Sequence, residues 1–107
     1  MTRAALAACF CIVASTLCAE APVQTVEFTC ERGALIRAAY DGQGDGASIV
    51  LSVDGWQIKL PVARSGSGIR FSDPGSGYVW HEKGTAAILF REEGTSARTI
   101  YADCRTG

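Results

Sequence analysis

Few residues of this 107-residue chain have the types and spacing that enzyme chemistry requires. The single histidine, His81, would have to act as the base of any Ser-His-Asp hydrolase. It lies in residues 78–82, whose pattern is typical of a strand, and the chain has no Gly-x-Ser-x-Gly nucleophile elbow. A chain of this length also leaves little room for a substrate pocket. We therefore predict that the protein is not an enzyme and that His81 is an ordinary exposed or contact residue.

The residues that could hold a metal or a cofactor do not form a complete set. Residues 41–46 resemble the start of a calcium-binding loop, but Ser52 stands at the twelfth position, where an EF-hand needs glutamate. The glycines of the same turn do not indicate a dinucleotide site, because no helix is expected to follow them. Cys30 and Cys104 have only His81 to assist them in a zinc site. We predict no metal and no cofactor.

The composition is that of one folded domain with balanced charge. Hydrophobic residues make up 48% of the chain and charged residues 20%, which is typical of a globular protein. The chain has 10 basic and 11 acidic residues, a formal net charge of -1. Its arginines are scattered among acidic residues and form no continuous track. These features argue against binding to nucleic acid, or to a membrane surface, through overall charge.

The first 19 residues have the pattern of a secretory signal peptide. Arg3 is followed by an apolar stretch and then by small residues, which predicts cleavage after Ala19 and a mature domain of residues 20–107. Removal of this segment leaves 9 basic and 11 acidic residues, a net charge of -2. The residue directly before Cys18 is Leu17, not the small residue typical of a lipid-attachment site. We therefore expect a soluble periplasmic protein, and attachment to a membrane would require lipidation of Cys18.

The cysteines of the mature domain predict one disulfide. The chain has 5 cysteines, of which only Cys30 and Cys104 follow the signal peptide. Two cysteines in an exported protein are typical of a disulfide. The closed loop would span most of the domain, so the bond is expected to stabilise the fold by roughly 4 kcal/mol.

The rest of the chain alternates short strands with tight turns. Apolar and polar residues alternate with a period of two, and Asp54-Gly55 is a strong signal for a two-residue hairpin. We predict an all-β fold, an antiparallel meander that curls into a small barrel to hide its edges, with a two-sheet sandwich as the alternative. The predicted strands are residues 23–30, 34–40, 48–53, 56–61, 69–72, 78–82, 86–91 and 97–104.

Two glycine-bounded loops carry a hydroxyl and an ammonium group. The first holds Ser67 and Gly68, with Phe71 following, and the second holds Lys83 and Gly84. Taken alone, both are ordinary turns. The spacing Ser67-Gly68-x-x-Phe71, however, resembles a signature of the bacterial inhibitors of c-type lysozyme, in which tyrosine usually stands at the last position.

A second motif of the same family follows in order. Trp80 lies three residues before Lys83-Gly84, and Ala87 and Leu89 come next in the same register. The resemblance extends over about residues 28–104, nearly the whole mature domain. One departure is the segment 73–77, which is longer than the usual hairpin between the two motifs and could shift Lys83 relative to Ser67.

The resemblance implies an eight-stranded barrel that plugs the lysozyme cleft. It also matches Cys30 and Cys104 to the disulfide that brackets the family's domain. Ser67 is then the inserted group and Lys83 its charged companion. The other members of the predicted inhibitory site are Gly68, Phe71 and Gly84.

Two other interpretations remain open from the sequence. The chain could be an exported β-barrel module that binds a small ligand, a peptide or a glycan, or it could be a structural lipoprotein of the envelope. The expected partner of an inhibitor is c-type lysozyme, and the sequence leaves formation of a homodimer open.

Overall fold

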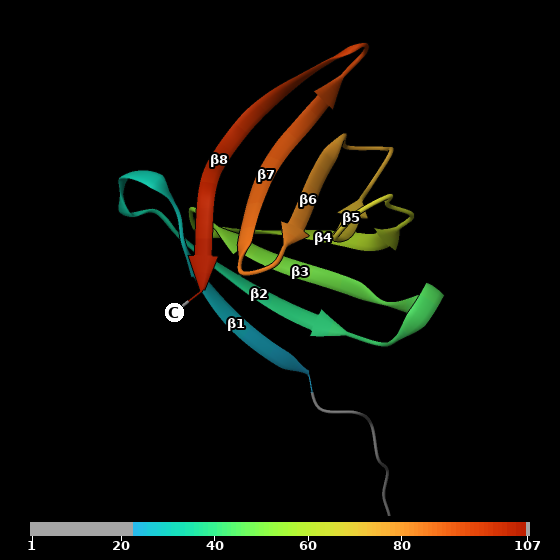
Figure 1. The fold of residues 1–107 in the computed structure, drawn as a ribbon, viewed down its shortest axis with the longest axis horizontal. Helices are drawn as coiled ribbons and strands as arrows, with labels where there is room; N and C mark the ends of the chain where they lie inside the picture. Colours follow the sequence, from blue (N-terminus) through green and yellow to red (C-terminus); the bar gives the residue numbers. More distant parts are fainter. Residues whose placement is uncertain (1–22, 107) are drawn as a thin grey trace, which may run out of the picture.

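The computed structural model describes residues 23–106, which form a closed antiparallel barrel of eight strands in the order of the sequence (Figure 1). This confirms the all-β prediction and rules out the two-sheet sandwich. The predicted signal peptide, residues 1–19 with Cys18, lies outside the described residues. The strands are β1 (Gln24–Thr29), β2 (Leu35–Asp41), β3 (Ser48–Val53), β4 (Trp56–Ala63), β5 (Ile69–Ser72), β6 (Tyr78–Lys83), β7 (Ala86–Glu93) and β8 (Ser96–Thr106).

Tight turns connect these strands, and two of them contain a short 3-10 helix. The first helix, Glu31–Gly33, links β1 to β2, and the second, Gly44–Gly46, links β2 to β3. Asp54 and Gly55 both have positive φ, as the predicted two-residue hairpin between β3 and β4 requires. Within residues 23–106 there is no helix with the length and apolar character to cross a membrane.

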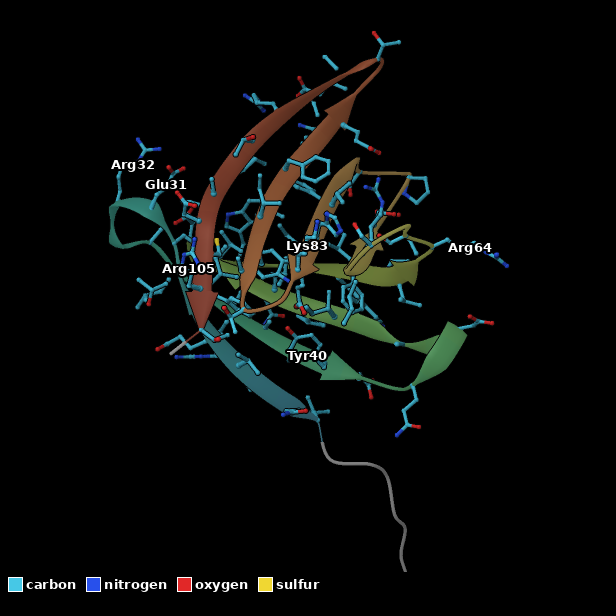
Figure 2. All side chains as sticks on the ribbon, viewed as in Figure 1. Glu31, Arg32, Tyr40, Arg64, Lys83 and Arg105 are labelled. Atoms are coloured by element: carbon cyan, nitrogen blue, oxygen red, sulfur yellow. A yellow bond between two sulfur atoms is a disulfide. The ribbon has the colours of Figure 1, made fainter. Side chains whose placement is uncertain are left out.

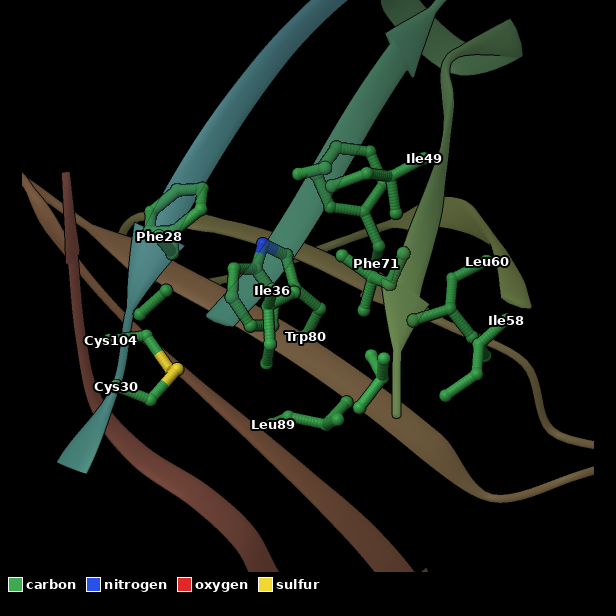
Figure 3. Close-up of a cluster of buried hydrophobic side chains, with 14 residues drawn as sticks. Phe28, Cys30, Ile36, Ile49, Ile58, Leu60, Phe71, Trp80, Leu89 and Cys104 are labelled. Atoms are coloured by element: carbon green, nitrogen blue, oxygen red, sulfur yellow. A yellow bond between two sulfur atoms is a disulfide. The ribbon is translucent and has the colours of Figure 1, made fainter. Parts of the chain in front are cut away.

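The core lies inside the barrel and follows the alternation of the strands. The fully buried side chains are apolar, and they include Trp80, Ile36, Leu51 and Leu89. Figure 3 shows Trp80 at the centre of this cluster, and its ring packs edge-on against Phe28 at 5.0 Å between centroids. Trp80 therefore fixes β6, the strand that ends at Lys83, to the interior.

A disulfide joins Cys30 to Cys104 beside the seam of the barrel (Figure 3). At that seam, β1 pairs with β8 through only two residue pairs, Phe28 with Thr106 and Thr29 with Arg105. β8 continues beyond Cys104, the predicted end of the last strand, and these added residues make the pairing. The predicted disulfide is thus present, and it reinforces the short pairing between β1 and β8 that closes the barrel.

Candidate functional site

The two glycine-bounded loops lie side by side because β5 and β6 are paired. Ile69 is opposite Glu82 and Arg70 is opposite His81, so the residues just before β5 lie beside those that end β6. The loop of residues 64–68 and the turn that follows Lys83 therefore occupy the same end of the β5–β6 hairpin. Figure 2 labels Lys83 at the end of β6.

Gly68 is pressed against the backbone of β6. Its φ is +69°, a conformation that favours glycine. A Cβ at this position would lie 2.2 Å from the backbone oxygen of Glu82 and 3.2 Å from the imidazole Nε2 of His81. Glycine is therefore required here for two reasons, its positive φ and the lack of space for a side chain. The close contact fixes the loop against β6.

Hydrogen bonds fix the backbone of Ser67, whereas its hydroxyl group forms none within residues 23–106. The Ser67 carbonyl accepts hydrogen bonds from His81 Nε2 at 2.8 Å and from Ser65 Oγ at 2.5 Å. The Ser67 amide donates to the same Ser65 oxygen at 3.3 Å. Within residues 23–106, Ser67 Oγ has no hydrogen-bond partner of its own, and the residue is exposed. The loop thus presents a hydroxyl group on a fixed backbone.

His81 has a role that the sequence analysis did not assign. Its imidazole on β6 donates a hydrogen bond to the Ser67 carbonyl in the loop before β5 and so fixes the backbone of Ser67. The sequence suggested only an ordinary exposed or contact residue. A strand pattern places a side chain on one face or the other. It does not reveal which loop of the next strand that face meets, so the sequence carried no signal for this contact.

Lys83 is the exposed last residue of β6. Among the ion pairs of residues 23–106, none includes Lys83, so its ammonium group is available to another molecule. The next residue, Gly84, has a φ of +64° and allows the tight turn into β7. Ser67, Gly68, Lys83 and Gly84 are therefore gathered at one end of the barrel.

Phe71 does not belong to this exposed group, which corrects the sequence-based assignment. Only 4% of its surface is exposed, and its ring packs against that of Tyr40 with 6.2 Å between centroids. The side chain points inward from β5 and anchors the strand in the core. Its contribution to the motif is to hold the loop in place, and the side chain is not available to touch a partner.

Glu82 lies on the inner face of β6, opposite in direction to His81. The indole Nε1 of Trp80 donates to its Oε2 at 2.7 Å, and the hydroxyl of Tyr40 donates to the same oxygen. Burial, followed by the hydrogen bond to Glu82, raises the pKa of the Tyr40 hydroxyl above its usual range. Tyr40 therefore remains a proton donor at neutral pH. These three residues connect β2 to the end of β6, a link that the sequence analysis missed.

The longer segment at residues 73–77 lies away from the site. It forms a compact turn at the other end of the β5–β6 hairpin, where both oxygens of the Asp73 carboxylate accept backbone N–H groups, from Gly75 and Ser76, each at 3.2 Å. The extra length is accommodated there, and β5 and β6 stay in register up to the pairing of Ile69 with Glu82. Ser67 and Lys83 therefore lie at the end of the hairpin opposite this turn.

Replacement of Gly68 by alanine is expected to lower the free energy of unfolding by about 1–3 kcal/mol, because the new Cβ must displace the loop or the backbone of β6. Urea denaturation measures the change. Gly66→Ala is a matched control, since an added Cβ there meets nothing within 4 Å. Equal stability of the two variants would contradict the close contact between the loop and β6.

The described part of the chain offers no obvious metal site. Within residues 23–106, no group of three or more His, Cys, Asp and Glu side chains is placed to share a metal ion. The chemistry that this end of the barrel offers is therefore that of a hydroxyl group and an ammonium group held on a rigid frame.

Comparison with known proteins identifies the family. The family described as membrane-bound lysozyme-inhibitor of c-type lysozyme matches residues 28–98. The chain belongs to this family. The match confirms the resemblance found in the sequence motifs, and it includes both glycine-bounded loops.

A relative is similar to the chain in sequence, and a solved structure is similar to it in fold. The chain is 34% identical over 82 residues to a membrane-bound lysozyme inhibitor of C-type lysozyme from Yersinia enterocolitica. The match covers 77% of this chain and 62% of the relative, so the chain spans slightly less than two thirds of that protein's length. The periplasmic lysozyme inhibitor of C-type lysozyme from Salmonella typhimurium has the same fold, with a TM-score of 0.67 and 17% identity over 80% of this chain and 99% of that one.

Proposed function

We propose that the protein is an exported inhibitor of c-type lysozyme that inserts Ser67 and Lys83 into the active-site cleft of the enzyme. The observation that carries this proposal is the placement of the two family motifs at one end of the barrel, where Gly68 packs on β6 beside Lys83. Ser67 Oγ and the Lys83 ammonium group are both exposed and unoccupied within residues 23–106. One cleft could therefore receive both groups.

The chemistry of the two groups suits the target. Lysozyme uses two carboxyl groups, one protonated and one ionised. A plug that expels water from such groups must supply new hydrogen bonds, because desolvation is otherwise costly. The Ser67 hydroxyl can both donate and accept, and the Lys83 ammonium group can pair with the ionised carboxylate.

The rigidity of the loops favours tight binding. His81 and Ser65 fix the backbone of Ser67, and Trp80 fixes β6. Binding then orders few groups that were mobile before, so little of the interaction free energy is lost to conformational entropy. Gly66 and Gly68 add no side chains that would keep the loop away from a narrow cleft.

Export would bring the protein to its target. We assign residues 1–19 as the signal peptide and residues 20–107 as the inhibitor domain, which would leave a periplasmic protein with a net charge of -2. The names of the two similar proteins, one membrane-bound and one periplasmic, support a location in the cell envelope. Lipid attachment at Cys18 would produce the membrane-bound form, and a diacylated Cys18 would be visible by mass spectrometry.

The proposal is tested by the turnover of a bacterial cell-wall suspension by c-type lysozyme. Addition of the purified exported protein is expected to slow clearing of the suspension and to abolish it near equimolar concentration. Serum albumin at the same concentration is the control for nonspecific effects. Undiminished turnover with excess protein, together with no heat of binding in calorimetry, would reject the proposed function and favour a module for another ligand.

A further inference from the structure

A hollow of about 280 Å³ opens in the barrel wall next to the turn that carries Lys83. Its lining includes Gln24 and Val26 of β1, Gly84 and Thr85 of the turn after β6, and Glu82. We call this hollow the β1 groove. We propose that it receives a cationic side chain, arginine or lysine, of the bound lysozyme, with the Glu82 carboxylate as its counter-charge. This inference rests on the proposed function.

The groove exists because the barrel closes over only a short length. β1 pairs with β8 at Phe28 and Thr29, and the first half of β1 has no strand on that side among residues 23–106. Figure 1 shows β1 diverging from β8 away from this pairing. The inward-facing Glu82 is therefore accessible from outside through the opening.

The charge of Glu82 has no counter-ion in the described part of the chain. All five ion pairs of residues 23–106 involve other carboxylates. Trp80 and Tyr40 hold one carboxylate oxygen with neutral donors, which orient the group without neutralising it. Because a carboxylate forms stronger hydrogen bonds with a cationic donor than with a neutral one, an arginine or lysine is the side chain that this groove fits best.

The position of the groove favours a side chain from the same partner that Lys83 contacts. Gly84 and Thr85, which line the groove, follow Lys83 directly in the turn. A protein that covers this turn also covers the mouth of the groove. A hollow of about 280 Å³ suits one side chain, and it is small for a glycan or a folded segment.

The charge preference of the groove is tested without lysozyme. In NMR titrations of the exported protein with N-ethylguanidinium, the signals of Gly84, Thr85 and the Trp80 indole N–H are expected to shift and saturate at concentrations on the order of millimolar. The neutral analogue ethylurea should cause no saturable shift. Glu82→Gln keeps an oxygen acceptor for Tyr40 and Trp80 but removes the charge, so the shifts should disappear. Equal shifts in this variant, or none in the wild type, would overturn the proposal.

The assignment of the occupant is tested with c-type lysozyme at low ionic strength. Glu82→Gln is expected to weaken inhibition about tenfold. Asp45→Asn removes one charge from an exposed turn without an ion pair and should leave inhibition unchanged. If Glu82→Gln inhibits as well as the wild type, the partner's side chain does not use the groove. If the wild type does not inhibit at all, the proposed function fails, and the guanidinium titration still decides whether the groove binds cations.

Discussion

The double replacement of Ser67 and Lys83 by alanine is expected to weaken binding to c-type lysozyme by about two to four orders of magnitude. Each group would form a hydrogen bond to a carboxyl group from which water is excluded, and such bonds contribute roughly 1.5–3 kcal/mol each. Their loss together corresponds to about a hundredfold or more in the dissociation constant. Calorimetry and the cell-wall turnover assay measure the effect. Each single variant should lie between the wild type and the double variant.

The matched control is the double variant Lys59→Ala and Thr95→Ala. It removes one ammonium and one hydroxyl group from exposed positions on β4 and in the turn between β7 and β8. Both double variants should unfold at the wild-type temperature, because none of the four residues is buried. Inhibition by the Ser67 and Lys83 variant that equals the control would reject the assignment of these two residues, while membership of the family would stand.

Replacement of both Cys30 and Cys104 by alanine is expected to lower the free energy of unfolding by about 4 kcal/mol. The two residues are separated by 74 positions, so the cross-link removes much conformational entropy from the unfolded chain. The loss is large beside the 5–15 kcal/mol that is typical of a folded protein. It should appear as a lower urea midpoint, since β1 and β8 are otherwise joined by two residue pairs.

Chemical reduction provides an independent check on the disulfide. Wild-type protein treated with dithiothreitol should unfold at nearly the same urea concentration as the Cys30→Ala and Cys104→Ala variant. The variant itself should not respond to the reductant. A midpoint that remains at the wild-type value in the variant would show that packing at the seam, and not the covalent bond, maintains the closure.

The strands could be predicted because their sequence patterns are local, and the disulfide could be predicted because few cysteines are available to form it. Alternation of apolar residues defines a strand within six or eight positions, and glycine-rich turns separate one strand from the next. If residues 1–19 are set aside as the predicted signal peptide, only one pairing of cysteines remains. The structure accordingly confirms all eight strands, with differences at their ends, and the bond between Cys30 and Cys104.

The details of the site could not be predicted, because they depend on which strands meet. Phe71 belongs to the same motif as Ser67, but a motif does not tell which of its side chains turn inward. The contact of His81 with Ser67 depends on the register between β5 and β6. Tyr40 and Glu82 are 42 positions apart, and only the curvature of the barrel brings them together.

The turn at residues 73–77 is a suitable position for attaching a label. It lies at the far end of the β5–β6 hairpin from Ser67 and Lys83. A Cβ added at Gly75 would lie nearest to the Asp73 carboxylate, at an ordinary contact distance of 3.6 Å. A dye or a surface linker attached there would leave the opposite end of the hairpin unobstructed, so an immobilised or fluorescent form can report on enzymes that arrive at that end.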